Sequence, residues 1–252
     1  MRSRIAVGCL MLALAGAAAG AAAQTPQHVF LPPVRGIFLT PIPNAPFSGT
    51  ISVQRTAIRP DGGTAQFWSV RRIARDSQGR IYNEFRPLQP ASVTAMPPVM
   101  TIHLYDPQSR ETEYLYPQSK VYTATLVNRP PRTDTTDGFA SPSSQSTPPS
   151  DFTKTEDLGY RTMDGVEVHG VRVTQTLPPD VSGTGSEVVV TDEYWYSANL
   201  RLNLEIRHND PRSGSVTMQV TDLNSNEPDP SLFTVPADYR MGVPGQAAKS
   251  DQ

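Results

Sequence analysis

The chain of 252 residues contains a single cysteine, Cys9. Once the leader described below is removed no cysteine remains, which excludes disulfides, a thiol nucleophile and thiolate metal ligands. A secreted domain without disulfides must be stabilised by a buried hydrophobic core. The 252 − 23 = 229 residues that follow the leader are enough for one such domain.

Residues 1–23 have the features of a bacterial signal peptide. Arg2 and Arg4 form a basic n-region, residues 5–14 are apolar, and Ala21-Ala22-Ala23 places small residues at positions −3 and −1. We therefore expect cleavage after Ala23 and a periplasmic or secreted protein. A transmembrane anchor would need ~20 strongly apolar residues, whereas the second half of this stretch is alanine and glycine. In a lipoprotein signal the modified cysteine follows a complete apolar stretch. Cys9 lies inside that stretch, so we do not expect a lipoprotein.

Excess charge of either sign is also missing. The formal net charge is −2, and removal of Arg2 and Arg4 with the leader makes it −4. This mild acidity gives no electrostatic footprint for nucleic acid or for an anionic membrane surface. We expect no nucleic-acid partner, and no transmembrane anchor after cleavage.

Helical patterning is absent, whereas proline is abundant. No segment of a dozen residues has the apolar spacing of an amphipathic helix. The 25 prolines are about twice the usual number, and their clusters indicate connections or sheet edges. The predicted organisation is a signal peptide (1–23), a Pro-rich N-terminal extension (24–48), an antiparallel β domain (49–240) with a flexible Pro/Ser/Thr loop (129–150), and a disordered tail (241–252).

The apolar residues between these clusters alternate with polar ones. This period of two is typical of strands with one buried face. The alternating residues that we expect to face a core or an apolar ligand are Leu200, Leu202, Leu204, Ile206, Val216, Met218 and Val220. Turn sequences such as Asp61-Gly62-Gly63 separate the runs. The sequence predicts a mainly β protein with little helix, built as a single curved antiparallel sheet, an open half-barrel meander.

Three local features refine this prediction. Val166 and Val168 are out of phase with the valines that follow them, which predicts a bulge at His169-Gly170. The segment Asp229-Pro230-Ser231-Leu232-Phe233 predicts a short helical turn that packs Leu232 and Phe233 on the sheet. The ten or so strand aromatics are expected to be core residues for the most part, with some lining a cavity.

Several motifs together resemble a known group of proteins. They include Ala74-Arg75-Asp76-Ser77-Gln78-Gly79-Arg80, Glu193-Tyr194-Trp195-Tyr196-Ser197, and Pro230-Ser231-Leu232-Phe233 before Val235-Pro236-Ala237-Asp238-Tyr239. Across most of residues 45–240 the chain is similar to uncharacterised secreted bacterial proteins. More distantly, it resembles the lipoprotein-carrier (LolA/LolB-like) half-barrel, although it lacks the amphipathic lid helices of those carriers. That resemblance implies an open antiparallel sheet curled around an apolar cavity.

Catalytic and metal-binding patterns are weak. The histidines that follow the leader are His28, His103, His169 and His208, and none has a partner at zinc-ligand spacing. His208 follows the Leu200–Ile206 stripe in phase and is expected near a carboxylate such as Asp210. No G-x-S-x-G elbow is present. We predict no catalytic, cofactor-binding or metal-binding residues.

One calcium-like pattern and two carboxylate pairs are interpreted as structural. Asp222-x-Asn224-x-Asn226 matches the start of a calcium loop, but Glu227 stands where glycine is needed and Phe233 where a bidentate Glu is needed. The adjacent pairs Asp192-Glu193 and Glu156-Asp157 point to opposite faces of a strand, so they do not form an acid/base site.

Three functions remain open from the sequence. The leading hypothesis is a non-enzymatic periplasmic or secreted binding protein that holds a lipid or other apolar ligand on a curved sheet. The alternative is an envelope-associated structural or interaction module that binds envelope proteins. An enzyme is third. A pocket lined by Leu and Val favours the first, a filled sheet face the second, and a His–acid pair in a cleft the third.

Overall fold

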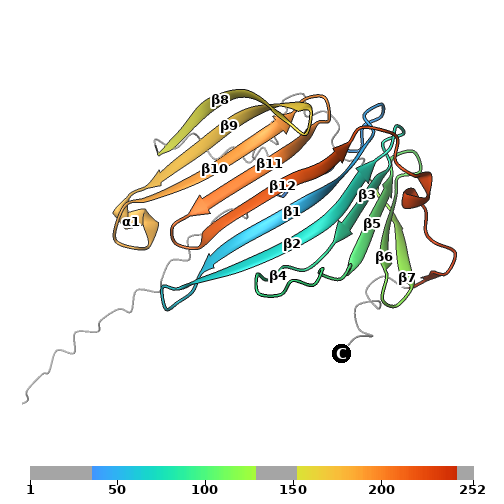
Figure 1. The fold of residues 1–252 in the computed structure, drawn as a ribbon, viewed down its shortest axis with the longest axis horizontal. Coiled ribbons are helices and arrows are strands. Elements are labelled where there is room, and N and C mark those ends of the chain that lie inside the picture. The colour runs from blue at the N-terminus through green and yellow to red at the C-terminus, as the bar shows by residue number, and fades with distance from the viewer. Residues whose placement is uncertain (1–35, 129–151, 243–252) are drawn as a thin grey trace, which may run out of the picture. The chain divides into compact units, whose positions relative to one another are not determined.

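A computed structural model describes residues 36–128 and 152–242 (Figure 1). The predicted signal peptide, His28, the predicted loop 129–150 and most of the predicted tail lie outside these residues.

Thirteen strands and two short helices make up the described chain. The first seven strands are β1 (Phe47–Ile58), β2 (Thr64–Arg75), β3 (Ile81–Phe85), β4 (Gln89–Pro90), β5 (Thr101–Asp106), β6 (Glu111–Tyr116) and β7 (Val121–Leu126). The others are β8 (Thr153–Met163), β9 (Val166–Leu177), α1 (Pro179–Ser182), β10 (Val188–Ser197), β11 (Leu202–Asp210), β12 (Gly214–Asn224), the 3-10 turn η1 (Pro230–Phe233) and β13 (Arg240–Met241).

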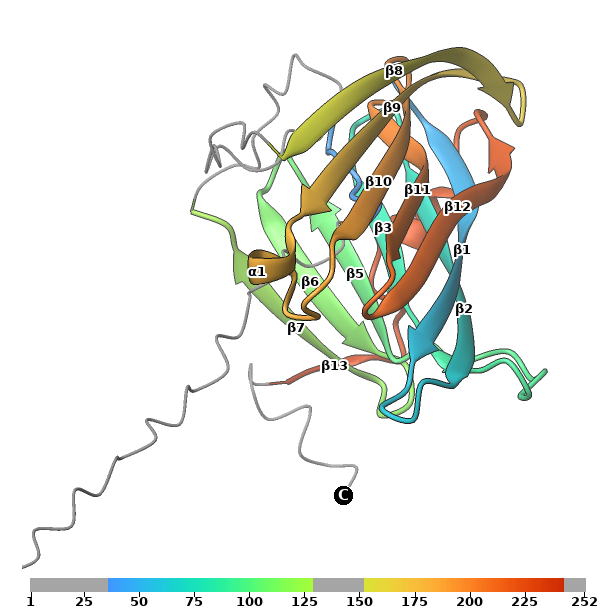
Figure 2. The same cartoon turned by 90° about the vertical axis from the view of Figure 1, so that its left-hand side faces the viewer.

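The strands form one open sheet in the order β13-β7-β6-β5-β3-β2-β1-β12-β11-β10-β9-β8, with β4 paired to β2. Figure 2 shows that the sheet curves. All pairings between its long strands are antiparallel, which confirms the predicted fold class. The β13–β7 pair is parallel. Two meanders, β1–β7 and β8–β12, join through the pairing of β1 with β12.

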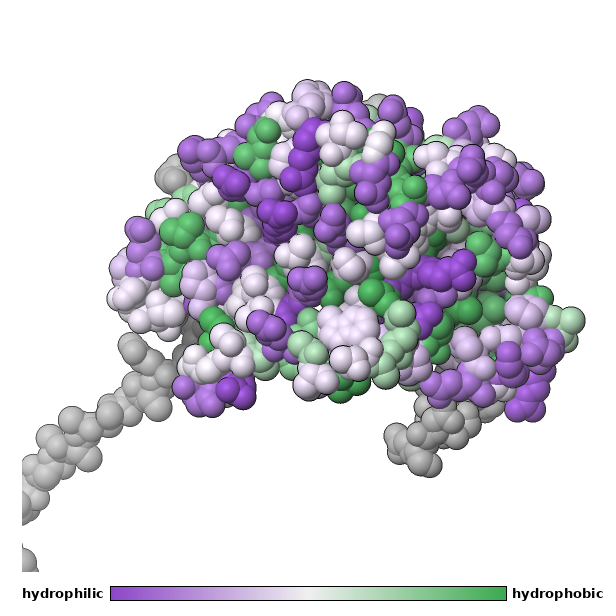
Figure 3. Space-filling view, viewed as in Figure 1, coloured by the Kyte–Doolittle hydropathy of each residue, from purple (hydrophilic) through white to green (hydrophobic). Residues whose placement is uncertain are grey.

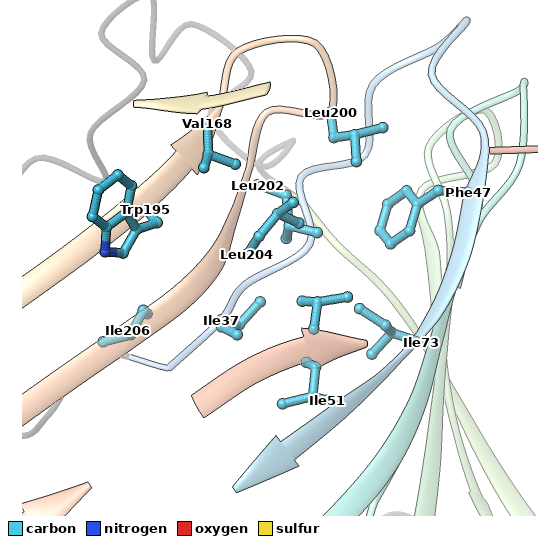
Figure 4. Close-up of a cluster of buried hydrophobic side chains, with 11 residues drawn as sticks. Ile37, Phe47, Ile51, Ile73, Val168, Trp195, Leu200, Leu202, Leu204 and Ile206 are labelled. Carbon is cyan, nitrogen blue, oxygen red and sulfur yellow. The ribbon is translucent and has the colours of Figure 1, made fainter. Parts of the chain in front are cut away.

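The main hydrophobic core includes part of the predicted Pro-rich extension. Strand β1 begins at Phe47, and Ile37, Ile42 and Phe47 are buried. Ile37 packs in the same cluster as Ile51 of β1 and Ile206 of β11. Figure 4 shows Ile37 between the side chains from β11 and those from β1 and β2.

A second core cluster confirms the predicted helical turn. η1 is capped by Asp229, whose side chain accepts a hydrogen bond from the Ser231 amide. Phe233 is buried beside Tyr82, Leu104 and other residues of β2–β6, and Leu232 packs against the same cluster. The predicted calcium-like segment is therefore followed by a capped turn.

The predicted bulge at His169-Gly170 is wrong. Strand β9 pairs with β10 without interruption through these residues, and the register shift lies in β8, between Asp157 and Gly159. Gly170 is needed for a different reason: a Cβ atom there would lie 2.5 Å from the Trp195 ring. The glycine lets Trp195 pack on the neighbouring strand.

Candidate functional site

The Ile206 face of the sheet is defined by a row of residues that stand opposite one another on seven adjacent strands. Directly opposite residues of antiparallel strands point to the same face. The row is Asp157, Val171, Tyr194, Ile206, Met218, Val53 and Ser69, from β8 to β2. The next row on the same face is Thr155, Val173, Asp192, His208, Val216, Arg55 and Phe67.

Five of the seven predicted apolar residues are core residues. Leu200, Leu202, Leu204, Ile206 and Val220 are all buried in the main cluster. Met218 is partly buried against that cluster, and Val216, one row further along, is partly buried. The residues of this set that could face a ligand are therefore Met218 and Val216 of β12, and the other five form the core beside them.

The predicted alternation of β11 is interrupted. The register of β11 against β10 shifts between Asn203 and Glu205, and every residue from Leu202 to Ile206 is buried. Strict alternation in this strand predicts Asn203 and Glu205 on the exposed face, opposite the leucines; this is wrong, because both are buried. Glu205 is instead paired with Arg161 of β8 at 2.6 Å and with Arg207.

Residues 36–46 cover the part of the Ile206 face that lies around Phe47 and Arg75. Arg75, which is fully buried, donates hydrogen bonds to the carbonyl oxygens of Thr40 (2.8 Å), Ala45 (2.9 Å) and Leu200 (2.8 Å). Its guanidinium also lies over the Phe47 ring. Burial lowers the Arg75 pKa to about 10, so the side chain stays charged near neutral pH. These contacts fix the segment against the sheet.

Six of the apolar residues in the two rows given above form what we call the Met218 surface. It consists of Val53, Val171, Val173, Tyr194, Val216 and Met218. All six side chains are only partly buried, and they come from four strands, β1, β12, β10 and β9. Three of them, Val53, Tyr194 and Met218, pack at their base against the core. The result is a set of partly exposed apolar side chains that borders the core on both sides of the buried Ile206.

The residues of the Met218 surface surround an ion pair. His208 Nδ1 lies 2.8 Å from Asp192 Oδ1 of the neighbouring strand. This hydrogen bond raises the pKa of His208. The carboxylate that meets His208 is thus Asp192, whereas the predicted Asp210 is buried and paired with Arg212 at 2.9 Å. Burial acts to raise the pKa of Asp210, but the hydrogen bonds from Arg212 outweigh it and lower that pKa.

The other two described histidines make local contacts. His169 Nε2 lies 2.7 Å from Asp157 Oδ1, and its ring stacks on Tyr160. His103 stacks on Tyr114 and contacts the Thr112 hydroxyl at 2.8 Å, and burial lowers its pKa. Among residues 36–128 and 152–242, no group of three or more His, Cys, Asp or Glu side chains could hold a metal ion. No helix within the same ranges is long and apolar enough to cross a membrane.

The opposite face of β8–β11 carries a charge ladder that the sequence did not reveal. Glu156, Arg172, Glu193 and Arg207 stand opposite one another on four adjacent strands. Arg172 Nη2 lies 2.9 Å from Glu193 Oε2, and Trp195 donates to Glu193 Oε1 at 2.7 Å. Burial acts to raise the pKa of Glu193, but these hydrogen bonds outweigh it and lower that pKa.

Two hollows on the described surface are lined by residues other than the seven predicted ones. One of about 460 Å³ lies over the charge ladder and includes Thr174, Thr191 and Asn209. One of about 150 Å³ lies where η1 meets β1 and β2. Figure 3 shows hydrophilic and hydrophobic residues interspersed on one face of the molecule. Neither of these two hollows is lined by residues of the Met218 surface.

Comparison with known proteins gives only structural similarity. No protein-family model matches the chain, and no curated protein matches its sequence. An uncharacterised conserved protein from Thermus thermophilus aligns with a TM-score of 0.38 and 9% identity, covering 79% of this chain and 90% of that one. A LolA superfamily protein from Nitrosomonas europaea aligns with a TM-score of 0.28 and 14% identity, covering 77% and 91%.

A third solved structure, MucB in complex with MucA, aligns with a TM-score of 0.35 and 13% identity, covering 77% of this chain and 55% of MucB. The distant LolA-like similarity expected from the sequence is thus found among solved structures. With such low TM-scores and identities, the similarity is one of strand arrangement and assigns no function to this chain.

Proposed function

We propose that this is a non-enzymatic binding protein, periplasmic or secreted, that holds a lipid or other apolar ligand on the Met218 surface. The observation that carries the proposal is a group of six partly buried apolar side chains that share one face of the sheet and lie on either side of the buried Ile206. Single exposed apolar residues are ordinary, but contiguous apolar surface marks a binding site.

The gain available to a ligand is substantial. Covering apolar surface contributes roughly 25 cal/mol per Å², and a fully buried Val or Met side chain contributes about 1.5–3 kcal/mol. Six partly exposed side chains, covered together, would therefore supply several times that contribution before the costs of association. A surface built on hydrogen-bonded strands of one sheet is also ordered before the ligand arrives, which reduces those costs.

An envelope-associated interaction module is the second candidate. It is favoured by a different part of the surface, the connection between β3 and β5. Leu88, Val93 and Met96 are 41%, 40% and 63% exposed there, and no charged residue occurs between Arg86 and His103. An exposed, uncharged apolar connection suits a protein partner.

Native mass spectrometry of protein purified from the cell envelope tests the proposal. We expect a bound apolar adduct on the wild type, and its loss in Val216→Trp, where a large ring covers the surface. The matched control is Thr217→Trp, on the same strand but the opposite face, which should keep the adduct. Both variants should melt within a few degrees of the wild type.

An adduct that survives Val216→Trp, or a wild type that carries none and binds no added amphiphile, would contradict the proposal. If Leu88→Asp abolishes capture of an envelope protein while the adduct is absent, the second candidate is favoured.

A further inference from the structure

Two basic side chains flank Val216 on the Ile206 face. Arg55 of β1 stands directly opposite Val216, and Val216 stands directly opposite His208 of β11. Neighbouring strands lie about 4.8 Å apart, so the Arg55 and His208 backbones are separated by roughly 10 Å. Both side chains project from the face that carries the Met218 surface, one on each side of its last row.

The acidic groups near this pair are few. Asp192 engages His208 through Nδ1 alone, and Asp210, on the same strand as His208, is held by Arg212. Arg55 is exposed, and within the described part of the chain no carboxylate forms an ion pair with it. With His208 protonated, Arg55, His208 and Asp192 carry a net charge of +1.

Apolar and cationic groups therefore meet along one line. Met218 and Val53 lie in the row next to the core, and Val216 lies in the next row with Arg55 and His208 beside it. A ligand chain that runs parallel to the strands over Val53 and Met218 would bring its end group to the second row. Charge-assisted hydrogen bonds to a carboxylate or phosphate are stronger than those to a neutral group.

We propose that the ligand is an anionic amphiphile whose chain lies on the Met218 surface and whose head group binds between Arg55 and His208. This inference rests on the proposed binding function. The shared head-group chemistry is an oxyanion, supplied either by a fatty acid carboxylate or by the phosphate of a single-chain phospholipid.

Matched amphiphiles of one chain length test the inference. Dodecanoate, dodecyl phosphate and dodecanol are titrated calorimetrically into the cleaved protein below their micelle concentrations. We expect at least one of the anions to bind about tenfold more tightly than the alcohol, and whichever anion binds more tightly identifies the head group. Arg55→Gln should remove that advantage, whereas Arg59→Gln, on the same hairpin and beside Asp61, should keep it.

The pH dependence gives a second readout. His208 loses its proton as the pH rises through its raised pKa, and the local charge then falls to zero because Arg55 and Asp192 cancel. Dodecanoate, which stays largely ionised over this range, should bind more weakly at about pH 8.5 than at about pH 5.5, and dodecanol binding should stay constant. Dodecyl phosphate is left out of this comparison because its second ionisation falls in the same range.

Equal binding of the alcohol and both anions, unchanged by Arg55→Gln, would overturn the anionic head group and leave the apolar site intact. Failure of all three compounds to bind would overturn the proposed function itself.

Discussion

Arg75 illustrates how one residue can fix residues 36–46 on the Ile206 face. Among the described residues no carboxylate pairs with its buried charge, and three backbone carbonyls and an aromatic ring take the place of a counter-ion. Because the carbonyls belong to residues 36–46 and to the β10–β11 turn, the side chain joins two segments that are far apart in sequence.

We expect Arg75→Met to destabilise the protein by about 3–5 kcal/mol, because each buried carbonyl left without a donor costs about 1–3 kcal/mol. Urea unfolding measures the loss. Arg59→Met is the control, since Arg59 is exposed and pairs only with exposed Asp61; its effect should stay within about 0.5 kcal/mol. Equal effects of the two variants would show that the Arg75 contacts do not hold the segment.

His208 makes the stability depend on pH in a defined direction. A histidine whose folded pKa is raised stabilises the fold below its unfolded value of about 6.5, and this contribution is lost as pH rises through the folded pKa. The unfolding free energy of wild type should therefore exceed that of Asp192→Asn most clearly near pH 5.5, with the difference shrinking toward pH 8.5. A difference that grows with pH would contradict the pairing.

At the scale of elements, the sequence patterns predicted the strands better than their partners. The apolar alternation of residues 214–224 and the turns between strands correspond to β12 and to observed hairpins. The pairing of β1 with β12 could not be predicted, because the two strands lie about 170 residues apart and nothing in their sequences identifies them as partners. For the same reason the partner of His208 was not identifiable: Asp192 lies 16 residues away on another strand.

Residues 36–46 were predicted to belong to an N-terminal extension because their prolines indicate a connection and not a packed strand. The segment has no strand period, yet Ile37 is buried and Phe38, its neighbour, is 70% exposed. The bulge in β11 was equally invisible, since buried Asn203 and Glu205 resemble solvent-facing strand residues in the sequence.

Ile37 and Phe38 provide an internal control for the packing of residues 36–46. Ile37→Asp should cost about 3 kcal/mol or more, because an unpaired carboxylate would be buried against Ile51 and Ile206. Phe38→Asp should be close to neutral. Chemical unfolding of both variants decides the matter, and a neutral Ile37→Asp would mean that the segment is not part of the core in solution.

The Pro/Ser/Thr-rich segment 129–150, outside the described residues, remains a prediction. Its composition offers too little apolar area to offset chain entropy. Replacing it with a short Gly/Ser linker should leave the melting temperature within a few degrees. A large loss on calorimetric melting would show that the segment packs against the domain.

For the whole molecule, the arrangement of two meanders explains where a ligand could bind. Pairing of β1 with β12 joins the meanders next to the filled core, and the Met218 surface draws on both of them, through Val53 of β1 and through the β9, β10 and β12 residues. The opposite face of β8–β11 carries the Glu-Arg-Glu-Arg ladder. The Ile206 face carries the Met218 surface, with Arg55, His208 and Asp192 in its last row.

The most direct test of the central claim is methyl NMR of the cleaved protein during titration with a single-chain amphiphile. We expect the methyl resonances of Met218, Val53, Val216 and Val173 to shift together, while those of Leu115 in the second core cluster stay unchanged. Shifts confined to Leu88, Val93 and Met96 of the exposed connection, with Met218 unaffected, would contradict the account.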